Sequence, residues 1–304
     1  MKLIIIFLVV QFFSAEACKA QHNDDGFLKA ADKFNRSRFN AVIISEAAVS
    51  TIATIGLQYL WYKNFPKSRF HFFNDNDEWL NMDKVGHATT AYNISAIQYN
   101  AMRWCGVPVN RSIIIGGFTG LAYLTMIEIS DGFSSQWGFS KGDMAANLLG
   151  TGLFVGQQYA WGQQKMQLRF SYHNSIFAKY NPKELGTHLP QRLLKDYNGQ
   201  TYWLSLNIAS ILNTNSRFPK WINADIGYGA EGMVNAVVNS SSIDGKPVPA
   251  FSRSRKLFFS ADGAFAKKGS FPYPGWINII HLPVPVAEVK IKNKFPLKVK
   301  PLYF

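Results

Sequence analysis

The chain has 304 residues, of which 47% are apolar, 15% aromatic and 17% charged. This composition excludes a disordered chain and is sufficient for one large hydrophobic core or two smaller ones. The net charge is +13, and the stretch from Gln191 onward has 15 basic and 6 acidic residues. Because the N-terminal segment predicts export, we expect this charge to face a membrane surface and expect no nucleic acid partner.

The first segment has the pattern of a secretory signal. A Met-Lys start is followed by an apolar run from Leu3 to Phe13 and then by small residues, which is the order found in cleaved signal peptides. We therefore assign residues 1–20 to a signal peptide, with cleavage after Ala17 or Ala20. A short N-terminal anchor helix is the alternative, but the run is shorter than the about 20 residues that a spanning helix needs.

Cys18 lies beside the expected cleavage site, so lipidation of its thiol is an alternative to simple cleavage. Glu16 stands where a lipidation motif has a small or apolar residue, which argues against lipidation. If Cys18 is removed with the leader, Cys105 is the only cysteine left, and an intramolecular disulfide is excluded. An exported chain of this length without disulfides must be held together by its core or by a bilayer.

Helical periodicity extends from Ala41 to about Trp161, and four long segments stand out. They are Ala41–Tyr62, Val85–Trp104, Ser112–Ile129 and Asp143–Trp161. Each has the length needed to cross a bilayer, and small residues at four-residue spacing let helices approach closely in lipid. The pairs are Gly116 and Gly120, Ala146 and Gly150, and Gly152 and Gly156. We therefore predict a membrane-embedded four-helix bundle over residues 40–165, with a soluble or interfacial bundle as the alternative.

After about Asn198 apolar and polar residues alternate, which predicts strands. The expected strands are Thr201–Ser210, Trp221–Tyr228, Leu257–Phe265, Trp276–Leu282, Val284–Ile291 and Phe295–Tyr303. The terminal Phe304 is a weak signature of an outer-membrane pore, but these strands fall short of the about eight that close a small barrel. The predicted fold class is α+β, in which segment 166–197 links the helices to an antiparallel β-rich region over residues 198–304.

Three short polar runs interrupt the apolar helices, and we expect them to meet in one cluster. The candidate residues are Asp83, His87, Glu128, Asp131, Asp143 and Asn147. Asp83 and His87 lie four residues apart on one helix face, and Ser140 with Asp143 has the spacing of a capping box. Because the third helix ends where the fourth begins, Asp131 and Asp143 should lie at the same end of the bundle.

The same motifs carry a resemblance to a known family. Asp-Lys-x-x-His at Asp83, Glu-x-x-Asp-Gly at Glu128 and Gly-Asp-x-x-x-Asn-x-x-Gly at Gly142 resemble the YfiM-like predicted periplasmic lipoproteins. They are more distantly similar to VanZ-like membrane proteins, which are associated with glycopeptide resistance. The resemblance covers roughly Trp61 to Trp161, and the motif Lys195–Trp203 is similar to the longer form of Bacteroidetes-type bacteria. It implies an envelope location and no established reaction.

The polar cluster has two interpretations. A histidine with several carboxylates can bind a divalent ion or transfer a proton, and ionisable groups at bilayer depth are functional candidates. In the structural interpretation, which we favour, His87 donates to a carboxylate, Asp143 caps a helix and Asn147 bonds between helices. The sequence has no metal or nucleophile motif of recognised spacing. The metal therefore stays unknown, and we expect no cofactor.

Other features have ordinary explanations. The aromatic residues at Phe70–Phe73 and Trp79 predict an interfacial aromatic belt, with a ligand-stacking box as the alternative. Alternating lysines predict a solvated strand edge or attraction for lipid headgroups; they are Lys290, Lys292, Lys294, Lys298 and Lys300. Four histidines have no visible partners and are expected to be structural: His71, His173, His188 and His281.

Together these features predict an exported, membrane-associated protein of the cell envelope, with the outer membrane or periplasm favoured over the inner membrane. We favour a non-enzymatic protein that binds a lipid or lipopolysaccharide surface or other envelope proteins. One alternative is a membrane enzyme or resistance factor that acts on an amphiphilic or lipid-linked substrate through the polar cluster. A second alternative is a small outer-membrane pore.

Overall fold

The computed structural model describes residues 30–57, 66–212, 219, 221–263, 279–291 and 296–303. The expected signal peptide, Cys18 and the first three residues of the predicted strand Trp276–Leu282 lie outside these residues. Contacts divide the chain into two compact units, a helical unit and a sheet unit. The helical unit contains Thr90–Gln163, and the sheet unit contains Asn76–Thr89, Gln164–Ala266 and Ile277–Phe304.

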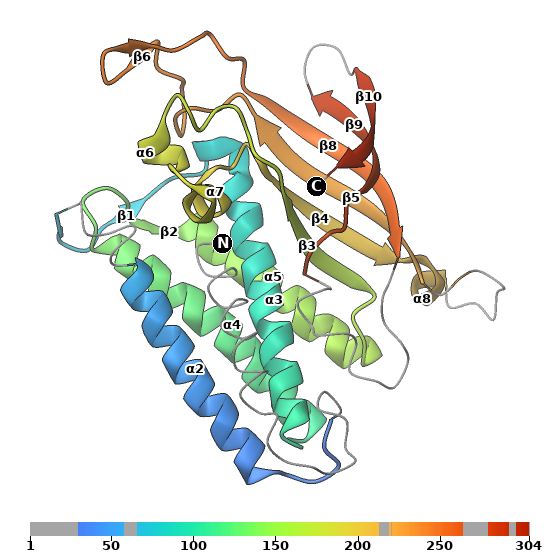
Figure 1. Ribbon diagram of the computed structural model, residues 1–304. Helices are drawn as coiled ribbons and strands as arrows, with labels where there is room; N and C mark the ends of the chain where they lie inside the picture. The colour runs from blue at the N-terminus through green and yellow to red at the C-terminus, as the bar shows by residue number, and fades with distance from the viewer. Residues whose placement is uncertain are drawn as a thin grey trace. The chain divides into compact units, whose positions relative to one another are not determined.

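Each of the four expected helices is present (Figure 1). They are α2 (Arg36–Leu57), α3 (Met82–Trp104), α4 (Val109–Gly132) and α5 (Lys141–Trp161). Two short strands, β1 (Phe72–Phe73) and β2 (Phe139–Ser140), pair in parallel within the helical unit. The sequence therefore predicted the helices to within a few residues, whereas their embedding in a membrane stays a proposal.

Small residues allow α3 and α4 to approach closely. A Cβ atom on Gly116 would lie 2.6 Å from the backbone oxygen of Ser95, and one on Gly120 would lie 2.8 Å from that of Ala91. Both positions therefore require glycine for this packing. In contrast, a Cβ on Gly152 or Gly156 would meet nothing within 4 Å. Of these two glycine pairs, the four-residue spacing therefore identified a close packing contact only for Gly116 and Gly120.

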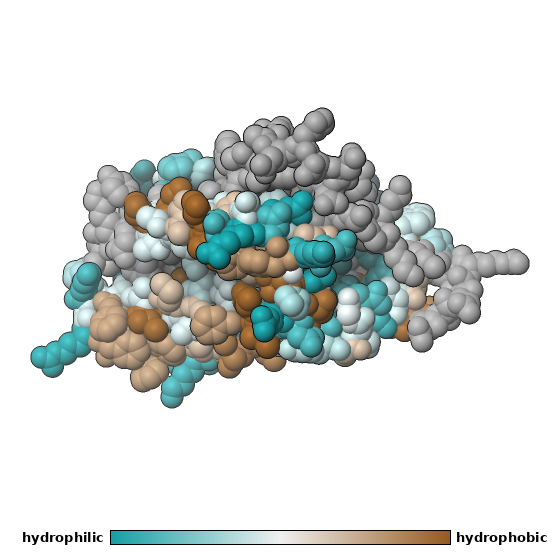
Figure 2. All heavy atoms as spheres, turned by 90° about the horizontal axis from the view of Figure 1, so that it is seen from below, coloured by the Kyte–Doolittle hydropathy of each residue, from teal (hydrophilic) through white to brown (hydrophobic). Residues whose placement is uncertain are grey.

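The hydrophobic core of the helical unit is formed where α2, α3 and α4 meet. One buried cluster contains Ala53, Ala91, Leu124 and Ile127, and a second contains Val42, Met102, Cys105 and Val107. Many larger apolar side chains point away from these clusters: Ile44 on α2, Phe118 on α4 and Leu149 on α5 are 69%, 71% and 72% exposed. Figure 2 shows hydrophobic residues gathered into patches on the face that it displays.

The sheet unit contains six strands in the order β10-β9-β8-β5-β4-β3, and all neighbours are antiparallel. Their bounds are β3 Met166–Tyr172, β4 Gln200–Asn207, β5 Ile222–Glu231, β8 Ser254–Gly263, β9 Val284–Ile291 and β10 Leu297–Tyr303. Residues 279–281 bond to the outer edge of β3 through a single parallel bridge between Phe170 and Ile280. The antiparallel β-rich region predicted at the C-terminal end is therefore confirmed.

The segment 166–197, expected to be a linker, contains regular structure. It forms β3 and two short helices, α6 (Pro182–Leu185) and α7 (Leu189–Lys195). Met166, Leu168 and Phe170 alternate with polar residues, which is the period of a strand. This short alternation follows the helical pattern of α5 so closely along the chain that it was not recognised as a strand. A second difference is that β4 ends at Asn207, where the Asn207 side chain accepts a hydrogen bond from the Ser210 amide and starts α8 (Ile208–Leu212).

Outside the main sheet, β6 (Ser242–Ile243) and β7 (Lys246–Pro247) form a small hairpin. Its turn is Asp244-Gly245, and both residues have positive φ values of 48° and 75°. This is the conformation that a two-residue hairpin turn requires and that Asp-Gly adopts readily.

The two faces of the main sheet differ in polarity. Side chains alternate between faces along each strand, so the register assigns every residue to one face. One face is buried and carries both a hydrophobic cluster, which includes Trp203 and Phe258, and a set of ionisable residues. The buried ionisable residues are Arg169, Asp225, Lys256, Asp262 and Glu288. The other face is apolar, and Phe259, Leu297 and Val299 are exposed there, Val299 by 69%. The sheet thus buries charge on one side and exposes hydrocarbon on the other.

Candidate functional site

The site begins at the first turn of α3, within the sheet unit. Asp83 Oδ2 and His87 Nε2 are 3.9 Å apart, as the four-residue spacing on a helix predicts. The phenol of Tyr197 donates a short hydrogen bond to Asp83 Oδ1. His87 is buried, while the Asp83 side chain is 25% exposed, so the carboxylate is the part of this pair that solvent reaches.

An unusual turn precedes α3 and fixes the place of Asp83. Trp79, Leu80 and Asn81 have φ values of 48°, 53° and 64°. Left-handed backbone costs about 1–2 kcal/mol per residue for side chains other than glycine, so surrounding contacts must hold the turn. The Tyr228 hydroxyl donates to the Leu80 oxygen at 2.5 Å, and the Trp79 amide donates to the Ala236 oxygen at 2.7 Å. No residue pattern in this segment predicted the turn.

The remaining candidates lie where α4 ends and α5 begins, in the helical unit. Ser140 caps α5 by accepting a hydrogen bond from the Asp143 amide at 3.0 Å, so the predicted capping motif is confirmed. Glu128 is buried, and its Oε2 accepts from the Ser140 amide at 3.1 Å. The Ser140 hydroxyl also donates to Asp75 Oδ1 at 2.6 Å. Carboxylates from three parts of the chain are therefore arranged around one helix start.

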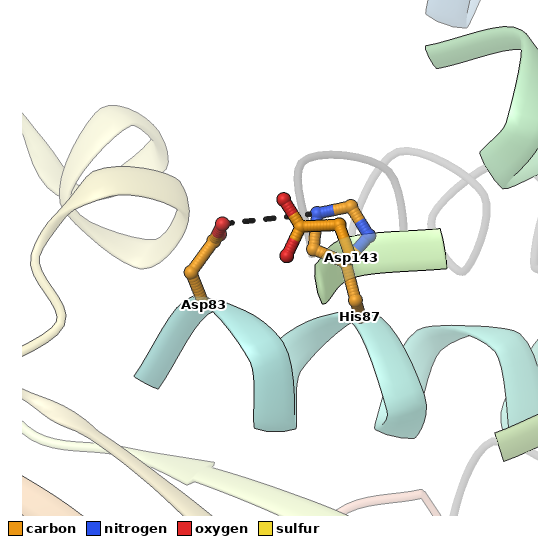
Figure 3. Close-up of side chains that lie close together, drawn as sticks. All are labelled: Asp83, His87 and Asp143. Atoms are coloured by element: carbon orange, nitrogen blue, oxygen red, sulfur yellow. Dashed lines mark ion pairs between the residues drawn. The ribbon is translucent and has the colours of Figure 1, made fainter. Parts of the chain in front are cut away.

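Within the sheet unit the structure brings two of the six predicted residues together, Asp83 and His87, and Figure 3 shows their ion pair. A carboxylate and an imidazole at this spacing could pass a proton or contribute ligands to a divalent ion.

The other four candidates lie in the helical unit. Glu128 contacts the start of α5, beside Asp143, by accepting from the Ser140 amide. Asp131 is buried near the end of α4, and Asn147 is fully buried on α5, where its amide lies 4.0 Å from the Met144 sulfur.

The motif Lys195–Trp203 has a structural explanation. Asn198 forms a two-way pair with the backbone of Met233, donating to its oxygen and accepting from its amide at 2.8 Å each. Asp196 is buried and accepts from the Ser175 hydroxyl and from Asn198; burial raises the pKa of Asp196, and these bonds oppose the rise. These bonds hold the segment before β4 in place, and within it the Tyr197 hydroxyl donates to Asp83.

Two smaller predictions concern surface residues. The aromatic run forms an exposed cluster in the helical unit, in which Phe70 contacts Phe72, Phe133 and Phe139 at ring distances of 5.3–5.8 Å. Of the alternating lysines, Lys290 pairs with Glu231 and Lys300 with Glu288. Lys292 and Lys294 lie outside the described residues. Ion pairing therefore occupies two of the lysines that were expected to be solvated or to face lipid.

Comparison with known proteins gives one match. Residues 71–157 match the family described as predicted periplasmic lipoprotein (DUF2279). The region of the candidate site resembles that family. The match contains α3, α4 and most of α5, and therefore all six candidate residues. No curated protein and no solved structure matches the chain.

The match bears on the predictions made from the motifs. It confirms that the resemblance is to a predicted periplasmic lipoprotein family, and the YfiM-like and VanZ-like details stay predictions. It also agrees with the localisation expected from the leader: the protein is exported and associated with the cell envelope. The family description includes no reaction, so the role of the site must be argued from its geometry.

Proposed function

We propose that this is a non-enzymatic, membrane-associated protein of the cell envelope that binds lipid through its exposed apolar surfaces. The observation that carries the proposal is the exposure of α2. The stretch Arg36–Gly56 is long and apolar enough to cross a membrane, yet only 17% of its most apolar window is buried. In water such a surface is unfavourable by about 25 cal/mol for each Å² of apolar area left exposed. Hydrocarbon contact removes that penalty.

A second helix and the sheet support the same proposal independently. Val109–Gly132 also has the length and composition of a membrane span, and 44% of its window is buried. On the sheet, the apolar face of β8 and β10 exposes Phe259, Leu297 and Val299, while the charged face is buried. Large continuous apolar surfaces on soluble proteins mark binding sites for membranes or partners. Polar inside and apolar outside is the arrangement expected where lipid is the solvent.

The experiment measures membrane retention without any lipid anchor. The full chain carrying Cys18→Ala, which removes the only thiol that a leader lipidation could use, is expressed and its membranes are washed at alkaline pH. We expect the protein to remain with the membranes and to be released by detergent. Release by the alkaline wash would overturn the proposal.

A matched pair of variants tests which surface is responsible. Ile44→Lys places a charge on the exposed face of α2, and Asn40→Lys places the same charge one turn earlier at an exposed polar position. A lysine at bilayer depth costs about 2.5–3.5 kcal/mol, so Ile44→Lys should reduce flotation with neutral vesicles. Asn40→Lys should not. Equal flotation of both variants would exclude α2 as the lipid contact.

Anionic headgroups of lipid or lipopolysaccharide form the second part of the proposal. The excess positive charge after Gln191 would add about 1 kcal/mol of attraction for each lysine or arginine near such a surface. Flotation with anionic vesicles should therefore exceed flotation with neutral vesicles, and the excess should disappear in high salt. A salt-insensitive difference would remove the electrostatic part and leave the apolar part standing.

The Asp83–His87 pair in Figure 3 favours a second candidate function, a membrane enzyme or resistance factor acting on an amphiphilic substrate. Asp83 would act at the solvent side, with His87 as its proton partner. Asp83→Asn and His87→Ala distinguish the two candidates. Loss of a cellular phenotype at a normal protein level would support the enzyme, whereas loss of the protein itself would support a structural role.

A further inference from the structure

The buried face of the sheet contains a second group of carboxylates with a histidine, far along the chain from the first. Asp225 on β5, Asp262 on β8 and His281 ahead of β9 each offer one ligand atom, and these atoms lie within 4.8 Å of one another. The side chains of Asp225 and His281 have no solvent exposure. From the sequence His281 was expected to be structural, and no motif pointed to the two aspartates.

We propose that Asp225, Asp262 and His281 hold a divalent transition-metal ion of the kind that imidazole and carboxylate ligands bind together, such as Zn²⁺. The inference does not depend on lipid binding or on the Asp83 group. It rests on three observations from the sheet unit: ligand atoms without partners, a missing positive charge, and side chains that already orient the three residues.

The first observation is a set of buried polar atoms without hydrogen bonds. Within the described part of the chain, both carboxylate oxygens of Asp225 and both ring nitrogens of His281 have no hydrogen-bond partner. The Ser205 hydroxyl, on the strand position directly opposite Asp225, has none either. Buried polar groups are nearly always paired, and unpaired ones indicate an ion or water. Three neighbouring residues with unused lone pairs point to one shared ligand.

The spacing fits a metal better than a proton. His281 Nε2 and Asp225 Oδ2 are 3.6 Å apart, which is too long for the hydrogen bond that an imidazolium and a carboxylate would form. Two ligands bound to one tetrahedral zinc at about 2.0–2.1 Å lie roughly 3.3 Å from each other. The observed separation is therefore close to that of two ligands sharing an ion.

The second observation is the charge balance. Asp225 and Asp262 carry two negative charges, and the Arg169 guanidinium, paired with Asp262, supplies one positive charge. With a neutral imidazole the group has a net charge of −1 in the interior. A buried uncompensated charge is strongly unfavourable, and a bound cation would remove that penalty.

The third observation is the support around the ligands. Asp262 accepts from the Asn223 amide at 2.9 Å as well as from Arg169. The His281 ring stacks on Trp203 with centroids 3.8 Å apart and planes 7° apart, and the His281 amide donates to the Phe170 oxygen. Metal ligands are characteristically oriented by such outer contacts. Each lone pair of a carboxylate oxygen can serve a separate partner, so the Asp262 bonds leave room for an ion.

The experiment uses the full chain, purified in detergent, stripped with a chelator and dialysed against Zn²⁺. We expect one tightly held Zn²⁺ per chain by elemental analysis and a higher Tm with the ion than without it. Asp225→Asn keeps the shape and removes a charged ligand, so its affinity should fall at least tenfold. His281→Gln should behave likewise. The matched variant His87→Gln, in the other acid–histidine group, should retain this ion.

Three results would overturn the proposal. One is a stripped wild-type chain that takes up no Zn²⁺, a measurement that needs no variant to fold. Another is unchanged affinity in Asp225→Asn and His281→Gln. The third is an imidazolium signal from His281 in the NMR spectrum of the Zn²⁺-treated protein, because a protonated ring has no free lone pair for a metal.

Discussion

The helical unit and the sheet unit differ in which residues pack in their interiors. In the helical unit the tight contacts are between small residues, such as Gly120 against Ala91, and the larger apolar side chains face outward. In the sheet unit the interior combines a hydrophobic cluster around Trp203 and Phe258 with buried ion pairs. In these pairs Lys256 lies between Glu231 and Glu288, and Arg169 lies on Asp262. Stability should therefore depend on shape in the first unit and on charge and pH in the second.

The sharpest difference should come from removing one interior charge of the sheet. Arg169→Met leaves Asp262 buried without its guanidinium, and breaking a buried pair costs about 3–5 kcal/mol. The matched control is Lys183→Met, which breaks the exposed pair with Asp244 at 3.0 Å in the same unit; such pairs contribute less than about 1 kcal/mol. Denaturant unfolding followed by circular dichroism gives both values. Similar losses from the two variants would contradict a sheet held by interior charge.

The pH dependence should be the next largest effect. Burial, with Lys300 and Lys256 nearby, lowers the pKa of His173 to about 4. A histidine whose folded pKa lies below its unfolded value gives its full stabilisation above about pH 6.5 and loses it as the pH falls toward 4. The loss amounts to about 2–3 kcal/mol.

A variant isolates that histidine from other titrating groups. Burial alone would raise the pKa of Glu231, but hydrogen bonds and charges from Lys256 and Lys290 outweigh it and lower that pKa, so its stabilisation is also lost in acid. Burial raises the pKa of Asp196, so this carboxyl favours the folded state more as the pH falls. The difference in unfolding free energy between wild type and His173→Gln, measured from pH 7 to pH 4, cancels these shared terms. A constant difference across that range would refute the assignment.

Packing variants should separate the two glycine positions of the helical unit. Gly120→Ala places a Cβ 2.3 Å from the Ser95 hydroxyl and 2.8 Å from the Ala91 oxygen, and such overpacking costs about 1–3 kcal/mol. Gly156→Ala meets nothing within 4 Å and should stabilise the helix by about 0.5–1 kcal/mol. Thermal unfolding in detergent compares the two. Equal effects would mean that α3 and α4 do not approach as closely as described.

The smallest expected effect is at the start of α5. Ser140→Ala removes the hydrogen bond that its hydroxyl accepts from the Asp143 amide and the one that it donates to Asp75. Loss of the cap alone should cost about 0.5–2 kcal/mol. Ser130→Ala, which removes an exposed bond to the Met126 oxygen within α4, should change stability by less than about 0.5 kcal/mol. Chemical denaturation resolves the two, and identical values would show that the cap does not hold the carboxylates in place.

The sequence was informative where one local pattern decides the outcome. The helix period located α3, α4 and α5, the Ser140–Asp143 spacing located a cap, and alternation located β9. Patterns that depend on distant partners were not readable. Asp225 and Asp262 lie near His281 only because of the strand register and the bridge at Ile280. The left-handed turn before α3 depends on contacts with residues more than a hundred positions away.

The candidate site itself was predictable in part. The helical spacing placed Asp83 next to His87, and the spacing of Ser140 and Asp143 located Asp143 in the first turn of α5. The sequence could not separate Asp143 from Asp131 or Asn147, because all three sit on apolar helices beside small residues. It also missed Tyr197, whose hydrogen bond to Asp83 follows from the folding of the segment before β4.

Spin labels on single cysteines determine whether the apolar side chains of this protein face lipid while its charges face inward. Burial raises the pKa of the Cys105 thiol to about 11, so it should label poorly, and Cys105→Ala removes it from the background. Labels at Ile44, Phe118 and Val299 in vesicles should collide more with dissolved oxygen than with a water-soluble nickel chelate. Preferential collision with the nickel chelate at all three positions would place these surfaces in water and contradict the account.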